Sequence, residues 1–421
     1  MFTTYGALIG LVVAIALIVR KMVPAYALIA GALLGGIVGG GNVVETVNAM
    51  ISGTQSMMPS VLRILASGIL VGALVKTGSA AKIADSIVRS LGERFALAAV
   101  AFATAVVCAV GVFVDIAVIT VAPVALAVGA RARLPVPALL LAMVGGGKAG
   151  NIISPNPNTI AAADAFKVEL TDLMAANIVP SLCALAVTVA LSAWLSFRLR
   201  RTCGDLAALQ ADDSLGTSER PALWSALSGP AAVVALLSLR PLTGIVIDPL
   251  VALPVGGAVS MFACGKWRGM LEYSQFGLGK VSGVAILLVG TGTIAGIIKS
   301  SGLNADMIAV LNALKLPMSA LAPVSGVLMA GATASTTAGA TIASQTFSAA
   351  LVDSGVPSVS AAAMLHAGAT VIDSLPHGSF FHATAGAVGM SVNQRLKVLP
   401  LGALVGLTST IVSIVVYMLK V

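Results

Sequence analysis

The stretch GGGKAGNIISPNPNTIAAADAF, at Gly145–Phe166, decides the fold because a long apolar run is interrupted by residues that break helices. Pro155 and Pro157 lack the backbone N–H that a helix interior needs, and three successive glycines allow backbones to approach closely. Irregular backbone at membrane depth survives only where protein buries it or where it lines a water-filled cavity. The stretch therefore predicts a broken membrane helix over residues 136–166, with a polar site at the break.

The whole chain has the composition of an integral membrane protein. Of its 421 residues, 58% are hydrophobic and 10% are charged, whereas soluble domains have about 45–50% apolar and about 25% charged residues. This composition excludes a cytosolic enzyme, a disordered chain and a disulfide-stapled secreted domain. The net charge of +8 comes from basic residues scattered between apolar runs, a pattern typical of membrane topology and not of a nucleic-acid-binding surface.

The motifs of metal and catalytic sites are missing from the sequence. The four cysteines lie far apart without a CxxC pair, and no metal-ligand cluster or Ser-His-Asp spacing is present. We therefore expect no metal site, no cofactor and no enzymatic activity. His377 with Ser379 is the one faint base–nucleophile candidate for a membrane-embedded hydrolase.

Long apolar runs without period-two alternation predict an all-α polytopic membrane protein. A second broken helix is expected over 359–390, and two further stretches, 95–130 and 316–351, have small polar residues at their middle. The uninterrupted spans are predicted at Tyr5–Val19, Val23–Gly40, Pro59–Val75, Ala175–Phe197, Ala222–Leu239, Ile245–Cys264, Val281–Ile298 and Val398–Leu419.

The two halves of the chain repeat each other. GALVKTG at Gly72–Gly78 resembles GIIKSSG at Gly296–Gly302, and Pro155 corresponds to Pro376 with a similar offset. The repeats are residues 1–200 and 222–421, and a charged linker over 201–221 joins them. Internal repeats of this kind are typical of secondary transporters.

Topology depends on the stretches 95–130 and 316–351. If each is a crossing plus a hairpin, each half crosses the membrane six times; if each is a re-entrant hairpin, each half crosses five times and the halves are inverted. The inverted arrangement puts 17 of the 24 Lys and Arg residues, Arg395 among them, on the cytoplasmic side. The positive-inside rule favours this arrangement, which has about ten transmembrane helices, two re-entrant hairpins, a cytoplasmic linker and extracytoplasmic termini.

Four segments at equivalent positions of the repeats are expected to be non-helical: Gly111–Asp115, Gly145–Asn158, Gly331–Thr341 and Asp373–Ala383. Half-helix N-termini that meet at the midplane favour a small anion. The predicted substrate-binding residues are Lys148, Asn151, Ser154, Asn156, Asn158, Ser335, Thr336, Thr337, His377 and Ser379.

Two alternatives to these substrate-binding roles stay open. Hydroxyls such as those of Ser335–Thr337 commonly bond back to helix carbonyls in membranes. The Lys148 charge can instead neutralise Asp115, the lone acid of the first hairpin, since ionisable residues at membrane depth usually pair.

Proton coupling is predicted at Asp115, Asp373, His377 and His382. An imidazole titrates between about pH 5 and 8, the range of a proton motive force. His377 is the preferred group, with Asp373 one helical turn away if the segment is helical. Arg63 and Asp164 are expected near an interface, where they can reach water.

The chain resembles the gluconate permease family of the ion-transporter superfamily. The resemblance rests on Gly145–Phe166, on ASTTAGATIASQTF at Ala334–Phe347, and on LPHGSFFHATAGAVGMSVNQRLK at Leu375–Lys397. It implies inward transport of sugar acids or other small hydroxy and amino carboxylates with protons. It also implies a homodimer in which a mobile transport domain, containing both hairpins and both broken helices, moves as an elevator against a scaffold domain.

We therefore expect a multi-pass protein of the cell inner membrane that imports a small organic anion together with protons. A Na⁺-coupled carboxylate transporter is the alternative. A passive anion channel would need a continuous polar path, whereas the polar residues here cluster centrally.

Overall fold

The computed structural model describes residues 2–20, 22–200, 221–237, 239, 245, 247–303, 306, 317–376 and 378–419. Regular structure in these residues is helical apart from one isolated bridge between Phe2 and Ser301. The prediction of an all-α protein is confirmed. Apart from Pro221, the predicted linker 201–221 lies outside the described residues.

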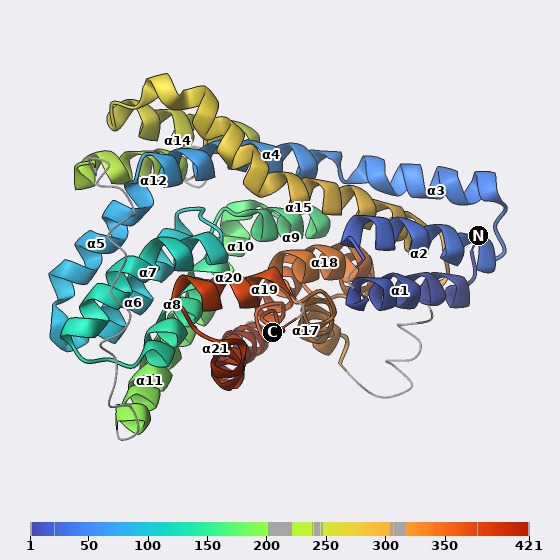
Figure 1. The fold of residues 1–421 in the computed structure, drawn as a ribbon. Helices are drawn as coiled ribbons and strands as arrows, with labels where there is room; N and C mark the ends of the chain where they lie inside the picture. The colour runs from blue at the N-terminus through green and yellow to red at the C-terminus, as the bar shows by residue number, and fades with distance from the viewer. Residues whose placement is uncertain are drawn as a thin grey trace.

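One group of helices forms the upper layer and the right-hand arm of Figure 1. The long helix α15 packs against α2, α3 and α4, while α14 packs between α4 and α12. The first group comprises α1 (Thr4–Val19), α2 (Pro24–Val38), α3 (Val43–Ser56), α4 (Met58–Lys76), α12 (Leu223–Leu237), α14 (Pro249–Ala263) and α15 (Met270–Lys299).

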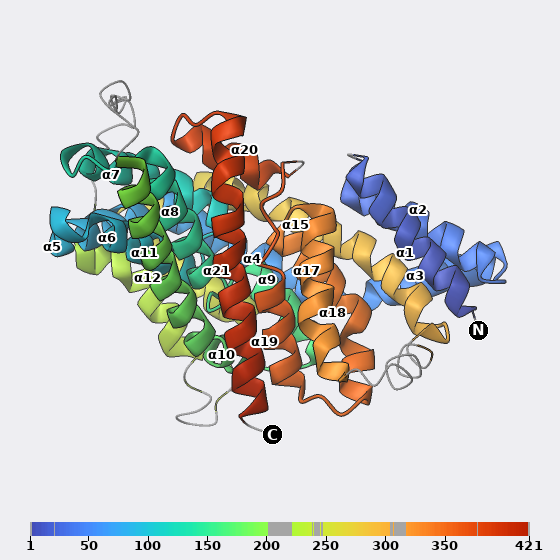
Figure 2. The ribbon, with the colours of Figure 1, turned by 90° about the horizontal axis from the view of Figure 1, so that it is seen from below.

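A second group lies below the upper layer of the first in Figure 1 and contains both predicted hairpins and both predicted broken helices. Its members are α6 (Ala96–Ala109), α7 (Val114–Arg131), α8 (Val136–Asn151), α9 (Pro157–Phe166), α10 (Leu170–Ala176), α11 (Ile178–Arg200), α17 (Leu321–Thr333), α18 (Thr336–Asp353), α19 (Ser358–Gly368), α20 (Ser379–Ala387) and α21 (Val392–Met418). Figure 2 shows α21 running between the helices of the first half and those of the second, and it packs against α8, α11 and α19.

The two groups meet along a seam. Helix α4 contacts α9, and α15 contacts α18. The amphipathic helix α5 (Ser79–Leu91) packs against α4 and α12 on one side and against α6 and α7 on the other. Short 3₁₀ turns complete the structure at Glu93–Phe95, Trp267–Gly269 and Met318–Ala320.

The outer surface is suited to lipid. In the described part of the chain, five helices are long and apolar enough to cross a membrane: α4, α7, α11, α15 with the turn before it, and α21. Large apolar side chains are exposed on several of them and on shorter helices; Trp224 is 84% and Leu271 is 80% exposed. A soluble monomer rarely exposes apolar surface on this scale.

The helices extend further into the polar segments than the sequence predicted. Helix α8 continues to Asn151, so the glycine run is helical and the first break is limited to residues 152–156. Helix α7 begins at Val114, and only Ala334 and Ser335 separate α17 from α18. The expectation of four fully non-helical segments was therefore wrong in extent.

Close packing explains why the glycine run stays helical. A Cβ atom on Gly146 would lie 2.1 Å from the Ala101 carbonyl oxygen, and one on Gly150 would lie 2.1 Å from that of Ala105. Glycine in a helix costs about 0.5–1 kcal/mol relative to alanine. The contact between α6 and α8 offsets that cost, because no larger residue allows the two backbones to approach so closely.

Two helices were mispredicted. Helix α3 was not expected; a capping box between Asn42 and Glu45 begins it. Helix α15 starts at Met270 instead of Val281.

Candidate functional site

The first break is held together by its asparagines. Asn156 caps α9: its Oδ1 accepts hydrogen bonds from the backbone N–H groups of Asn158 and Thr159, at 2.9 and 3.2 Å. The Asn151 Oδ1 accepts from the amide groups of Asn156 and Asn158, at 2.7 and 3.1 Å. The SPNPN sequence therefore builds a buried amide cluster where α8 ends and α9 begins.

Several polar atoms of this cluster remain unsatisfied. Asn151 Nδ2, Ser154 Oγ and Asn158 Oδ1 are buried and have no hydrogen-bond partner among the described residues. Buried polar groups are nearly always hydrogen-bonded, so exceptions need an explanation such as a bound molecule or water. The three atoms comprise donors and acceptors, which suits the hydroxyl groups of a substrate.

The second break provides the partner of Lys148. Lys148 Nζ lies 2.8 Å from Asp373 Oδ1, and each side chain is 2% exposed. The ammonium also donates to the backbone carbonyls of Thr370, at 2.5 Å, and Gly402, at 3.1 Å. Lys148 thus pairs with Asp373 from the second half of the chain, and the alternative that it neutralises Asp115 has no support among these contacts.

The second hairpin also holds Asp373, on the side of its Oδ2 atom. Thr336 Oγ1 donates to Asp373 Oδ2 at 2.6 Å, and Ser374 Oγ donates to Asp373 Oδ1 at 2.7 Å. Thr336 is the first residue of α18, and Lys148 lies in the last turn of α8. The positive helix end faces the carboxylate and the negative end holds the ammonium, so both dipoles stabilise the pair.

The other hydroxyls of the second hairpin have different positions. Ser335 caps α18, its Oγ accepting from the Ala338 N–H at 3.2 Å. Thr337 is partly buried. Of the three predicted hydroxyl residues, Thr336 is the one that joins the charged cluster.

The predicted proton-coupling residues are dispersed. Asp115 lies in the first turn of α7 and is partly exposed. His382 is exposed, and its Nε2 donates to the Pro376 carbonyl at 2.8 Å. Residues 369–376 are not helical, so Asp373 has no helical spacing to position 377. His377 and the side chain of Ser379 lie outside the described residues.

Sequence reasoning missed Arg395 as a site residue and counted it only among the basic residues of the cytoplasmic side. The residue is 1% exposed in the first turns of α21, and its guanidinium lies 5.4 Å from the centre of the Phe381 ring. Arg395 is within electrostatic range of both Asp373 and Lys148. The only sequence signal was its place inside LPHGSFFHATAGAVGMSVNQRLK, close to the second break.

An ion-pair bridge crosses the seam between the two groups of helices. Arg63 of α4 bonds Asp164 of α9 and donates to Asp248, at the start of α14, at 2.6 Å. Arg63 and Asp164 are partly solvent-accessible, as the sequence predicted.

Two cavities adjoin this bridge at the seam. One, of about 480 Å³, is lined by Arg63, Asp164 and Asp248. The other, of about 340 Å³, lies between α3, α15 and α18 and is lined by Gln345, Thr346 and Lys299 among others. Lys167 and Asp164 line both cavities, so side chains of both charges border this space.

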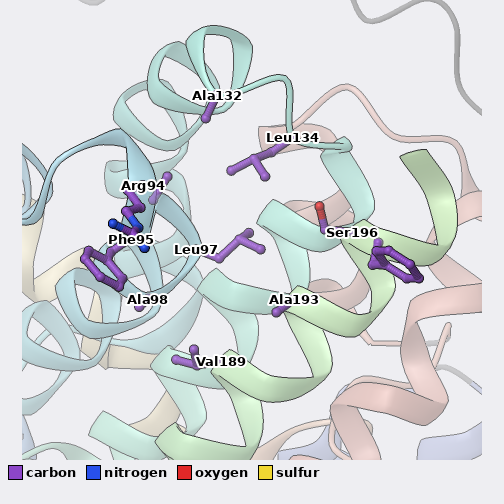
Figure 3. Close-up of a pocket in the computed structure, with 11 residues that line it drawn as sticks. Arg94, Phe95, Leu97, Ala98, Ala132, Leu134, Val189, Ala193 and Ser196 are labelled. Atoms are coloured by element: carbon purple, nitrogen blue, oxygen red, sulfur yellow. The ribbon is translucent and has the colours of Figure 1, made fainter. Parts of the chain in front are cut away.

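A larger cavity, of about 600 Å³, lies away from the predicted site (Figure 3). Leu97, Leu134, Val189 and Phe197 line it, with Arg94 at one side. Its mostly apolar walls offer few polar groups to orient a small anion, so size alone does not identify the site here.

The amino-acid sequence is similar to those of known transporters and permeases. A family model described as GntP family permease matches residues 2–420. An uncharacterized transporter of Haemophilus influenzae is 50% identical over 412 residues, which is 98% of this chain and 97% of that protein. An uncharacterized permease of the same organism is 27% identical over 193 residues, covering 45% of this chain and 39% of that protein.

The fold is similar to that of a solved transporter. The crystal structure of the Alcanivorax borkumensis YdaH transporter, reported to have an unusual topology, matches with a TM-score of 0.68. The match covers 89% of this chain and 88% of that one at 17% identity. Together with the helices apolar enough to span a bilayer, these matches identify a multi-pass membrane protein, and the chain belongs to the GntP family of permeases.

Proposed function

We propose that this permease is a secondary active importer of a small organic anion, a gluconate-like sugar acid or hydroxycarboxylate, coupled to protons. The buried Lys148–Asp373 pair is the observation that carries the proposal. It joins the first broken helix, the second break and the tip of the second hairpin. A buried ion pair is weak evidence for stability, whereas ionisable residues inside membrane segments usually serve ion or substrate pathways.

The substrate is proposed to bind between the two breaks. Its hydroxyl groups would satisfy the unpartnered polar atoms of Asn151, Ser154 and Asn158. Asn156 and Ser335 would act indirectly, since each caps the helix that positions the site. The proposed roles of Thr337, His377 and Ser379 rest on sequence alone.

Asp373 is the proposed proton acceptor nearest the substrate. Its carboxylate is the one acidic group in contact with Lys148 among the described residues. Protonation would weaken its bond to Lys148 and release the ammonium for the substrate. A proton taken up with an anion would also leave the net charge of this cluster unchanged. The loaded and the empty carrier would then meet a similar electrostatic barrier when they move through the membrane. Asp115, His377 and His382 are the alternative proton sites.

The two groups of helices are proposed to be the two parts of an elevator. The second group holds both hairpins and both breaks, as expected of a transport domain, while the first would be the scaffold and the dimerisation surface of a homodimer in the cell inner membrane. A few helix pairs, such as α4 with α9 and α15 with α18, connect the two groups across the seam. The seam also contains two cavities. Such a seam supports sliding of one group past the other.

The test is transport by the purified protein in proteoliposomes. We expect labelled gluconate or a related hydroxycarboxylate to accumulate when the outside is acidic, without Na⁺, and to exchange in counterflow. Accumulation driven by a Na⁺ gradient and indifferent to pH would replace the proton with Na⁺. Conductance far above carrier rates would indicate a channel. Absence of uptake and counterflow for every acid tested would overturn the proposed function.

A further inference from the structure

Arg395 is a buried cation that forms no salt bridge with any residue that the structure describes. None of its three guanidinium nitrogens has a hydrogen-bond partner within the described parts of the chain. The residue is 1% exposed, so bulk solvent does not compensate for the missing bonds. Among the described residues, its guanidinium makes one cation–π contact. That contact is with the ring of Phe381 in α20, whose centre is 5.4 Å away.

Burial in this state is costly. A buried charge without a partner is strongly unfavourable, and the cost falls only when an anion or several acceptors satisfy the group. A cation–π contact contributes about 0.5–2 kcal/mol, too little to compensate for a desolvated guanidinium. Arg395 therefore requires a partner that the described chain does not supply.

Asp373 cannot fill this role in the observed arrangement. Its carboxylate accepts from Lys148, Ser374 and Thr336, and no guanidinium nitrogen of Arg395 is hydrogen-bonded to it. Around this carboxylate the structure gathers two cations, Lys148 and Arg395, within electrostatic range. The cluster of these three residues thus carries one uncompensated positive charge.

We propose that Arg395 binds the carboxylate of the transported anion. The inference rests on the proposed function and adds its specificity-determining residue. A guanidinium is planar and matches a carboxylate with two parallel hydrogen bonds. The guanidinium of Arg395 lies over the Phe381 ring, and α20 and α21, which pack together, carry these two residues next to the second break (Figure 2). The carboxylate would then lie on Arg395 while the hydroxyl groups extend toward the amide cluster.

The test compares variants of the full-length protein in detergent. Binding of gluconate, glycerate and lactate is measured by thermal shift and by calorimetry, with glucitol as the uncharged control. For an acid that binds the wild-type protein, Arg395→Gln should lower affinity by roughly 10- to 100-fold, as expected for hydrogen bonds to a charged group. Arg395→Lys should lose less, because it keeps the charge but not the planar fork.

A second measurement separates binding from packing. Without ligand, Arg395→Gln should have an unchanged or higher unfolding temperature, since it removes an unpaired buried charge. Arg198→Gln is the matched control: Arg198 also lies over an aromatic ring, Trp194, but is exposed, and its loss should leave affinity unchanged.

These measurements can refute the role of Arg395 and the proposed function separately. Unaltered affinity in Arg395→Gln, or a large drop in ligand-free stability in both Arg395 variants, would overturn the role of Arg395 and assign it to packing. If the wild-type protein neither binds nor transports any acid, the proposed function fails. In that case the unfolding temperatures of the ligand-free variants still decide whether Arg395 is an unpaired buried charge.

Discussion

At the scale of single residues, the buried Lys148–Asp373 pair joins two segments that lie far apart in the sequence. Removing one partner leaves the other charge buried and unpaired, which costs about 3–5 kcal/mol. We therefore expect Lys148→Met to destabilise the protein by about that amount and to abolish uptake. Lys148→Met/Asp373→Asn should regain most of the stability, because both charges are gone, but should not regain proton-driven uptake. Unfolding curves and proteoliposome uptake measure the two effects.

A second lysine–carboxylate pair provides the control. Lys76 Nζ lies 3.1 Å from Glu272 Oε1, and the side chains are 35% and 68% exposed. An exposed pair contributes about 0–1 kcal/mol, so Lys76→Met should change stability little and leave uptake intact. Full uptake in the double variant at positions 148 and 373 would remove both residues from the proposed mechanism.

At the scale of helices, close contact between α6 and α8 positions Lys148 and Asn151. A Cβ on Gly146 would meet the Ala101 carbonyl oxygen at 2.1 Å, so Gly146→Ala should force α6 away from α8 and cost about 1–3 kcal/mol. Gly279→Ala in α15 is the matched control. An added Cβ there meets no atom within 4 Å in the described structure, and alanine should stabilise the helix by about 0.5–1 kcal/mol. Equal effects of the two substitutions on thermal unfolding would contradict this account.

At the scale of the molecule, the question is which ends of the helices share a side of the membrane. Helix α21 runs from α20 at the upper edge of Figure 2 to the C-terminus at the lower edge, and the N-terminus also lies in the lower half. In the inverted topology, the end of α11 is cytoplasmic and the end of α18 is extracytoplasmic. Single cysteines at Arg198 and Asp353, both exposed, should therefore react with an impermeant thiol reagent from opposite sides.

This labelling needs a background without the four native cysteines. A variant that keeps only Cys108, which is fully buried, serves as the unreactive control. Reaction of both introduced cysteines from the same side would rule out the inverted arrangement.

The sequence by itself determined most of the helices and the positions of the breaks. Hydropathy and backbone chemistry act locally: a long apolar run forms a membrane helix, and prolines with asparagine caps end one helix and start the next. That reasoning placed the first break within Gly145–Asn158, whereas the structure limits it to residues 152–156 and shows Asn156, predicted to bind substrate, as the cap of α9. It overestimated the irregular segments, because the tight packing around Gly145, Gly146 and Gly147 comes from Thr188, Ala101 and Val114, which lie on three other helices.

Only the tertiary structure decided which charges meet. Lys148 and Asp373 lie in different halves of the chain, and either could have paired elsewhere, as the alternative with Asp115 illustrates. The sequence indicated only that Arg395 is a basic residue of the cytoplasmic side, and the structure shows it as a desolvated guanidinium beside Phe381. Local pattern carries no signal for such contacts, because the energy of a buried charge depends on which distant segments fold around it.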